Sequence, residues 1–191
     1  MKNLVMLLML VAVFTFTLTA CQQSDNEEQD IKSAASPYLS LEQVRAMLVE
    51  KGFYDREKNK NGTGITHQYE PKTINGETIV IDHTTGLTWQ QRGRESINYE
   101  GAKSYVIRLN KEGYGGFHDW RLPTLEEAMS LMEPVKNEDN QLFIDPTFDS
   151  AQRFIWTVDK PHAPGVWVVG FAGGSCYGFH VSTRLCVRAV R

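Results

Sequence analysis

The chain has 191 residues, a formal net charge of −3 at pH 7, 41% hydrophobic residues and 23% charged residues. This composition excludes a wholly disordered chain, a collagen-like protein and a protein with several membrane spans. Because the net charge is slightly negative, no overall electrostatic attraction to nucleic acid is expected.

The first 20 residues are predicted to form a secretory signal peptide. Lys2 precedes an apolar stretch over residues 4–20, which is short for a membrane-spanning helix and ends in small residues. Leu18-Thr19-Ala20-Cys21 resembles the bacterial lipobox, which implies that Cys21 is acylated once the leader is removed. An ordinary signal peptide with an incidental cysteine is the alternative. The lipobox implies a lipid anchor in a membrane of the bacterial cell envelope, and Gln22 favours the outer membrane.

Residues 21–36 are polar and acidic without apolar periodicity, which predicts a flexible tether. Residues 37–76 are interpreted as an N-terminal helix and loop extension. Within it, Ser40 and Gln43 form a capping-box pattern before a helix expected over residues 41–51 and ended by Gly52. The apolar stripe of this helix is either part of the core or a docking face.

Residues 55–64 are polar and end in glycines, which predicts a solvated loop. A calcium-binding EF-hand loop beginning at Glu57 would have glycine at its sixth position, where Gly62 stands, but its twelfth residue is Gln68 instead of glutamate. Calcium is therefore only weakly supported, and no cofactor is expected.

Residues 77–191 carry the pattern of one α+β domain, with a few helices packed on antiparallel strands. The pattern predicts a hairpin over residues 78–82 and 87–90, a helix over 98–109, a short helix opened by a capping box at Thr124 and Glu127, and strands over 154–158, 166–171 and 184–190.

Three separated blocks in this domain, residues 82–90, 113–124 and 187–191, resemble the C-terminal domain of the Legionella collagen-like adhesin and its relatives. The resemblance spans residues 77–191. It implies a secreted or surface module of unknown function, and the adhesin itself is associated with sulfated polysaccharide.

The same blocks are more distantly similar to the C-type-lectin-like fold of formylglycine-generating oxidases, through residues 121–127 and 173–175. This likeness argues for fold and not for activity. Structural roles are expected for a set of motif residues, in which the arginines would pair with acidic side chains: Asp119, Trp120, Arg121, Pro123, Glu127 and Arg188. Trp89 is also expected in the core.

Cys176 and Cys186 remain once Cys21 is assigned to lipid, and in an oxidising envelope they are candidates for a disulfide. The alternative is a redox or copper-binding pair, as in the oxidases. Their catalytic cysteines are more closely spaced than these two, so the resemblance carries catalysis over only weakly.

The loops at residues 160–165 and 170–178 are the expected ligand edge, because binding residues are commonly displayed on loops above a rigid sheet. The candidate ligand-binding residues are Trp156, His162, Trp167, Tyr177 and Arg184. Bases outnumber acids by three over residues 147–191, which suggests a local anion-binding patch. The histidines show no metal-ligand spacing.

The sequence therefore predicts an envelope-anchored lipoprotein whose domain binds a ligand, either a glycan or another envelope component such as a protein, with no catalytic residues. Two alternatives stay open: a thiol or copper oxidoreductase related to formylglycine-generating oxidases, and a structural envelope module.

Overall fold

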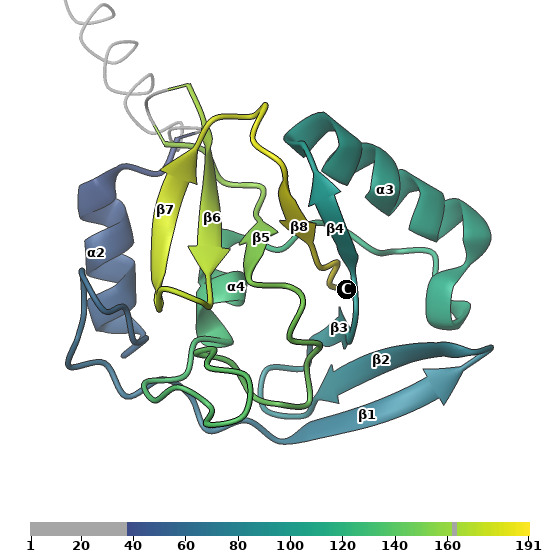
Figure 1. Cartoon of the computed structure of the whole chain (residues 1–191), viewed down its shortest axis with the longest axis horizontal. Coiled ribbons are helices and arrows are strands. Elements are labelled where there is room, and N and C mark those ends of the chain that lie inside the picture. The colour runs from purple at the N-terminus through teal and green to yellow at the C-terminus, as the bar shows by residue number, and fades with distance from the viewer. Residues whose placement is uncertain (1–37, 162–163) are drawn as a thin grey trace, which may run out of the picture. The chain divides into compact units, whose positions relative to one another are not determined.

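The described residues, 38–161 and 164–191, form two β-sheets and three α-helices in this computed structural model (Figure 1). The predicted signal peptide, Cys21, the tether and His162 lie outside the described residues. The first sheet has the order β1-β2-β3, and the second has the order β4-β8-β5-β6-β7. The predicted α+β class is confirmed.

The first helix, α2 (Leu41–Glu50), starts and ends close to where the sequence predicted. Ser40 Oγ accepts from the Gln43 N–H, and the Gln43 side chain accepts from the Ser40 N–H, so the capping box is complete. Gly52 follows the helix with a φ of +67°, a conformation that glycine adopts without steric cost. Val44 and Leu48 are buried, so the apolar stripe belongs to the core.

The small sheet contains the predicted hairpin, β2 (Glu77–Asp82) with β3 (Thr88–Gln90), paired antiparallel with Val80 opposite Trp89. A third strand, β1 (Tyr69–Ile74), was not predicted from the sequence. It pairs antiparallel with β2 through a turn in which Asn75 and Gly76 both have positive φ. Four of its six residues are exposed, so it lacks the apolar alternation of a half-buried strand.

The two remaining helices also begin at side-chain caps. α3 (Tyr99–Glu112) is capped by Asn98 and followed by Gly113 in the left-handed conformation. A short 3-10 turn, η2 (Tyr114–Gly116), comes next. α4 (Leu125–Ser130) starts at the capping box formed by Thr124 and Glu127.

The large sheet is built from β4 (Arg94–Ile97), β5 (Phe154–Trp156), β6 (Val166–Gly170), β7 (Ser175–Phe179) and β8 (Leu185–Val187). Its strands pair antiparallel except for β5 and β8, which are parallel. β4 was not predicted, and β7 occupies residues that were read as a glycine-rich turn.

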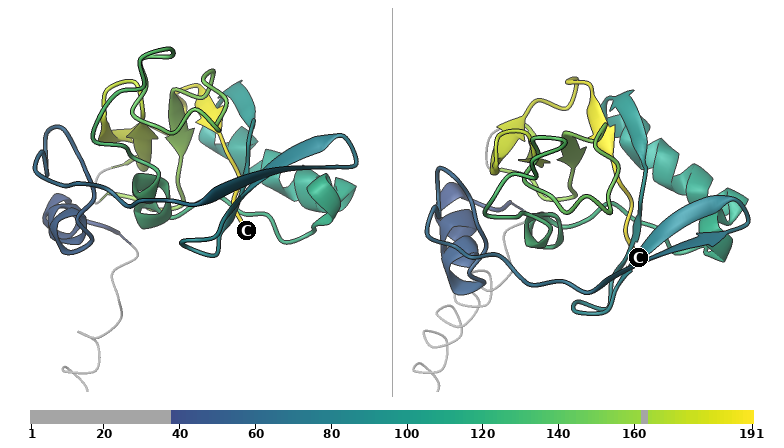
Figure 2. Two further views of the ribbon diagram at one scale, coloured as in Figure 1. Left: turned by 90° about the horizontal axis from the view of Figure 1, so that it is seen from below. Right: turned by 60° about the horizontal axis from the view of Figure 1, so that its bottom comes forward.

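Two hydrophobic clusters pack on the two faces of this sheet. The first contains residues of α2 and α4, together with Ile155 and Val169 from the sheet. The second contains the buried face of α3, with Trp156 and Val168. Figure 2 shows α2 and α4 lying near each other and apart from α3. No helix within the described residues is long and apolar enough to cross a bilayer.

The N-terminal extension packs into the same core as the rest of the domain. Phe53 lies in the first cluster with Val169, and Trp167 Nε1 donates to Leu39 O at 2.9 Å. Pro37–Arg191 accordingly form one compact unit.

Candidate functional site

A groove runs between α3 and the segment that joins β3 to β4. One hollow of about 460 Å³ is lined from three parts of the chain, 76–78, 91–93 and 105–114. A second hollow of about 320 Å³ is lined by residues of 94–108. Both hollows include Tyr105 and Arg108, so together they form one surface feature, called the α3 groove here.

Two glycines bring the walls of the α3 groove close to the domain body. A Cβ at Gly93 would lie 1.7 Å from Val187 O, so only glycine lets this wall rest against β8. A Cβ at Gly101 would lie 2.5 Å from Ile97 Cγ1, which fixes the start of α3 beside β4. The groove is thus built on the backbone of the large sheet.

Tyr105 is held in the groove by a buried glutamine. Gln90 Nε2 donates to Tyr105 Oη at 3.0 Å, while Gln90 Oε1 accepts from the Ala189 N–H at 3.0 Å. Burial raises the pKa of Tyr105, more than the hydrogen bond from Gln90 lowers it, so the hydroxyl keeps its proton at neutral pH. That proton is available to a ligand because Gln90 uses only the lone pair of the hydroxyl oxygen.

Arginines supply the charge of the α3 groove. Arg108 lies with its guanidinium carbon 5.4 Å from the centre of the Tyr105 ring. Arg94 and Arg108 are exposed and make no ion pair with any described residue. Arg92, by contrast, pairs with two acids: its Nη2 lies 3.7 Å from Glu95 Oε1, and its Nε lies 3.6 Å from Asp149 Oδ2. Two acids, Glu77 and Glu112, also line the larger hollow.

The sequence-predicted ligand residues do not form this groove or any shared site. Trp156 and Trp167 are in the core, at 0% and 5% exposure, because their strands are buried on both faces. Trp156 Nε1 donates to Ile97 O and Trp167 Nε1 to Leu39 O, so both side chains are held within the domain.

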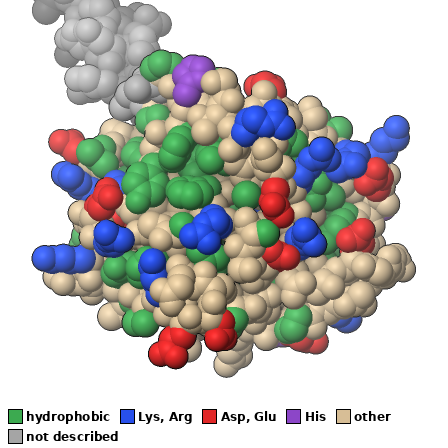
Figure 3. Space-filling model, in the orientation of Figure 1, with side chains coloured by type: hydrophobic (Ala, Val, Ile, Leu, Met, Phe, Trp, Pro, Cys, Tyr) green, Lys and Arg blue, Asp and Glu red, His purple; other side chains and the backbone are tan. Residues whose placement is uncertain are grey.

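Tyr177 and Arg184 do reach the surface, but on different parts of the domain. Figure 3 shows hydrophobic side chains gathered over β6 and β7. Tyr177 and Phe179 lie on β7 with their ring centres 6.3 Å apart, and Lys58 Nζ lies 5.4 Å from the centre of the Tyr177 ring. Arg184 precedes β8 and donates to Ser96 O at 2.6 Å. Strands β5 and β6 separate β8 from β7, so these two side chains do not act together.

Two of the five bases counted in the predicted anion patch of residues 147–191 make other contacts. Arg188 is completely buried, and Arg191 Nε lies 2.7 Å from Asp119 Oδ1 in an ion pair. These two arginines therefore do not contribute to a surface patch with Arg153, Lys160 and Arg184.

The two cysteines are free thiols, which corrects the predicted disulfide. Cys176 on β7 is opposite Val169, Val169 is opposite Ile155, and Ile155 is opposite Cys186 on β8. Three strand spacings separate the cysteines, about 14 Å, whereas a disulfide needs Cα atoms within about 7 Å. The same separation prevents the two thiols from acting as a redox or copper-binding pair.

The motif residues have structural positions. Arg121 donates to both carboxylate oxygens of Glu127 at 2.6 and 2.7 Å, so this expected pair is present. Burial opposes the ionised form of Glu127, but hydrogen bonds from Arg121 and Thr124 outweigh it and lower its pKa. Asp119 pairs with Arg191 instead of Arg121 or Arg188.

Trp120 and Pro123 complete this motif. Trp120 is 2% exposed and donates from Nε1 to Tyr114 O at 2.9 Å, beside the α3 groove. Pro123 is buried immediately before the cap of α4.

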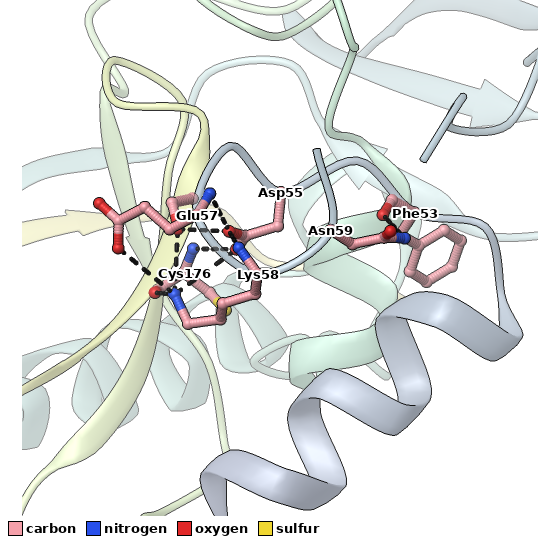
Figure 4. Close-up of polar contacts among 7 residues, drawn as sticks. Phe53, Asp55, Glu57, Lys58, Asn59 and Cys176 are labelled. Carbon is pink, nitrogen blue, oxygen red and sulfur yellow. Dashed lines mark hydrogen bonds and ion pairs between the residues drawn. The ribbon is translucent and has the colours of Figure 1, made fainter. Parts of the chain in front are cut away.

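The loop predicted to be solvated contains a buried carboxylate. Asp55 is 0% exposed and accepts from the Ser175 hydroxyl at 2.7 Å and from the Cys176 N–H at 2.9 Å. It also accepts from the N–H groups of Glu57 and Lys58, and Figure 4 shows this loop docked on β7. Burial opposes ionisation of Asp55, but these donors outweigh it and lower its pKa.

This cluster is structural in character. Lys58 Nζ lies 3.0 Å from Ser175 Oγ, a pairing that some hydrolases use, but Ser175 is 0% exposed and its hydroxyl already donates to Asp55. No group of three or more potential metal-binding side chains occurs within residues 38–161 and 164–191.

Sequence reasoning missed every residue that gives the α3 groove its chemistry. Tyr105 and Arg108 lie in the helix predicted over residues 98–109, but neither they nor Arg94 were singled out as candidate site residues. The available signal was the run Gln90-Gln91-Arg92-Gly93-Arg94, where bases and a glycine follow a strand.

The comparisons with known proteins support the resemblance stated from the three sequence blocks. A family model described as the Lcl C-terminal domain matches residues 78–191. No curated protein matches the chain. Since the match covers more than half of the sequence and confirms the predicted resemblance, the chain belongs to the family of the Lcl C-terminal domain.

Proposed function

We propose that this chain is a lipid-anchored protein of the bacterial cell envelope whose domain binds a glycan in the α3 groove without catalysing a reaction. The observation that carries the proposal is that Arg94 and Arg108, two cations without ion-pair partners among the described residues, line the same hollow as Tyr105, with Arg108 over its ring.

The chemistry of the groove favours a glycan that carries acidic groups. A guanidinium binds carboxylate, sulfate or phosphate through two parallel hydrogen bonds. A tyrosine offers an apolar ring with a polar tip, which suits a sugar that is apolar on one face and polar at its edges. Glu77 and Glu112, which also line the larger hollow, would accept from sugar hydroxyls.

Binding in the groove is tested with a chain that begins at residue 22, without the leader and the lipid-bearing Cys21, titrated with acidic and neutral polysaccharides at low and physiological salt. Arg108→Ala and Arg94→Ala are each expected to weaken binding of the acidic polymer about tenfold, because each removes one charged hydrogen-bonding group. Arg45→Ala, an exposed arginine on α2, is the matched control and should bind normally. Equal binding by all variants would assign the glycan to another surface, and no binding to any polymer would remove the glycan proposal.

The anchor is supported by the sequence from Leu18 to Cys21 and by the polar tether that follows it. Membrane fractionation and intact-mass analysis test it in bacteria expressing the full chain. The wild-type chain is expected in the membrane fraction with the added mass of acyl groups. Cys21→Ser should remove that mass and release the chain from the membrane, and an unmodified wild-type protein would contradict the anchor.

A further inference from the structure

Arg188 is a buried cation that forms no ion pair with any described residue. It is 0% exposed, and its guanidinium carbon lies 4.7 Å from the centre of the Phe148 ring. Nη2 donates to Gln91 O at 3.3 Å and to Asp149 O at 3.2 Å. Nε and Nη1, which carry three N–H groups, have no hydrogen-bond partner among the described residues, and no described carboxylate forms an ion pair with this arginine.

Other buried donors without partners belong to residues near Arg188. The Tyr69 hydroxyl is one, and the Tyr69 ring lies edge-on to the same Phe148 ring, with centres 5.1 Å apart. The side-chain amide of Gln152 is another, three residues after Asp149, whose carbonyl Arg188 contacts. Trp89 Nε1 is also without a partner, and Trp89 bridges Val190, two residues beyond Arg188.

The unpartnered atoms of this cluster include too few hydrogen-bond acceptors, and the positive charge of Arg188 is not balanced. Among its unpartnered atoms only Gln152 Oε1 is purely an acceptor, while arginine, tryptophan and the amide nitrogen can only donate. A water molecule would bring two further donors and no charge, so it would not correct this imbalance. Burial lowers the pKa of Arg188 to about 10, so it remains a cation at neutral pH, and an unpaired buried charge is strongly unfavourable.

We propose that Arg188, Tyr69 and Gln152 bind a small monovalent anion, a halide or a carboxylate such as formate, inside the domain. One negative charge balances the single guanidinium, and a compact acceptor receives the donors that the protein leaves unused. The acids near Tyr69 do not serve this purpose. Asp82 Oδ2 lies 2.8 Å from His67 Nδ1, and burial raises the pKa of Glu133. The charge of Asp149 acts on Arg188, but Asp149 forms no ion pair with it, and Asp149 Oδ2 lies 3.6 Å from Arg92 Nε.

Thermal unfolding in defined salts tests the site without reference to any glycan. The mature chain is prepared in sodium gluconate, and bromide replaces gluconate at constant ionic strength. A specific site predicts a melting temperature that rises with the logarithm of the bromide concentration above the dissociation constant, by about 5–10 °C once bromide exceeds that constant a hundredfold. Sodium formate in place of bromide shows whether carboxylates share the site.

Two tyrosine variants separate anion binding from a general salt effect. Tyr69→Phe removes a hydroxyl that has no protein partner, so it should reduce the bromide-dependent rise while leaving the melting temperature in gluconate unchanged or higher. Tyr114→Phe is the control, because the Tyr114 hydroxyl donates to Thr78 O and should not affect the bromide response.

Crystals grown in sodium bromide supply a direct readout. An anomalous peak within hydrogen-bond distance of Arg188 Nε or Nη1 supports the site. Density for water alone at that position, together with melting temperatures that are the same in bromide, formate and gluconate, overturns it.

Discussion

Gln90 donates its side-chain amide hydrogen to Tyr105 Oη at 3.0 Å, so a fully buried residue of the small sheet fixes an aromatic ring of the α3 groove. Gln90 Oε1 simultaneously accepts from the Ala189 N–H next to Arg188. The core and the groove wall are therefore joined through one side chain, whose two polar ends are both in use.

Tyr105→Phe tests how much the hydrogen bond between Gln90 and Tyr105 contributes to the free energy of unfolding. The change keeps the ring beneath Arg108 but leaves Gln90 Nε2 buried without an acceptor, which costs about 1–3 kcal/mol of unfolding free energy. Urea unfolding measures this loss. An acidic glycan that stacks on the ring should still bind, and one that accepts from the hydroxyl should bind less tightly. Unchanged stability would show that Gln90 finds another acceptor.

Helix boundaries were predictable because their signals are local. Ser40 with Gln43 and Thr124 with Glu127 make the capping boxes that their spacing predicts, and Asn98 caps α3. Each cap depends on residues within four positions of one another, so the sequence alone contains the interaction.

Two of the strands were missed for identifiable reasons. β1 is exposed along most of its length, and its one strong signal was Asn75-Gly76, the pair that favours a tight hairpin turn. β7 was hidden by Gly173, Gly174 and Gly178, which read as a turn although the last of these continues the strand.

The α3 groove could not be predicted because its walls come from segments that the fold alone brings together. Gly93 approaches Val187 across nearly half of the chain. The cysteines show the opposite case, in which residues close in sequence lie far apart. Nine residues separate Cys176 from Cys186, but the strand order places β5 and β6 between them.

Gly93→Ala is expected to disrupt the groove wall. The new Cβ would lie 1.7 Å from Val187 O, so β4 must move away from β8, at a cost of about 3 kcal/mol or more. Gly178→Ala is the matched control, because its Cβ would approach Pro161 Cγ at an ordinary 3.6 Å. Thermal unfolding compares the two. Equal melting temperatures would mean that the backbone near Gly93 adjusts without loss.

Asp55→Asn should destabilise the docking of the loop on β7, by about 2–4 kcal/mol at pH 7, because the amide cannot accept from all four donors. The folded state lowers the pKa of Asp55 below its ordinary 3.8. The carboxylate therefore contributes its stability above about pH 4, and this contribution is lost as the pH falls through the folded pKa.

Denaturant unfolding of the wild-type chain and Asp55→Asn at pH 7 and near pH 3 measures this dependence. The difference between the two proteins should shrink in acid, since protonation removes the charge that the substitution also removes. A difference that stays constant across this range would assign the stabilisation to shape instead of charge.

The free cysteines predict a specific pattern of alkylation. Burial raises the pKa of Cys176 to about 12, so its thiol should be inert in the folded domain, and the half-buried Cys186, whose pKa burial also raises, should react slowly. Intact-mass analysis of the chain that begins at residue 22 and lacks Cys21, isolated under oxidising conditions, should show two added labels after unfolding without reductant. Cys186→Ser should leave the melting temperature nearly unchanged, because it breaks no cross-link. A loss of several degrees together with no labelling before reduction would restore the disulfide and would require β7 and β8 to be rearranged.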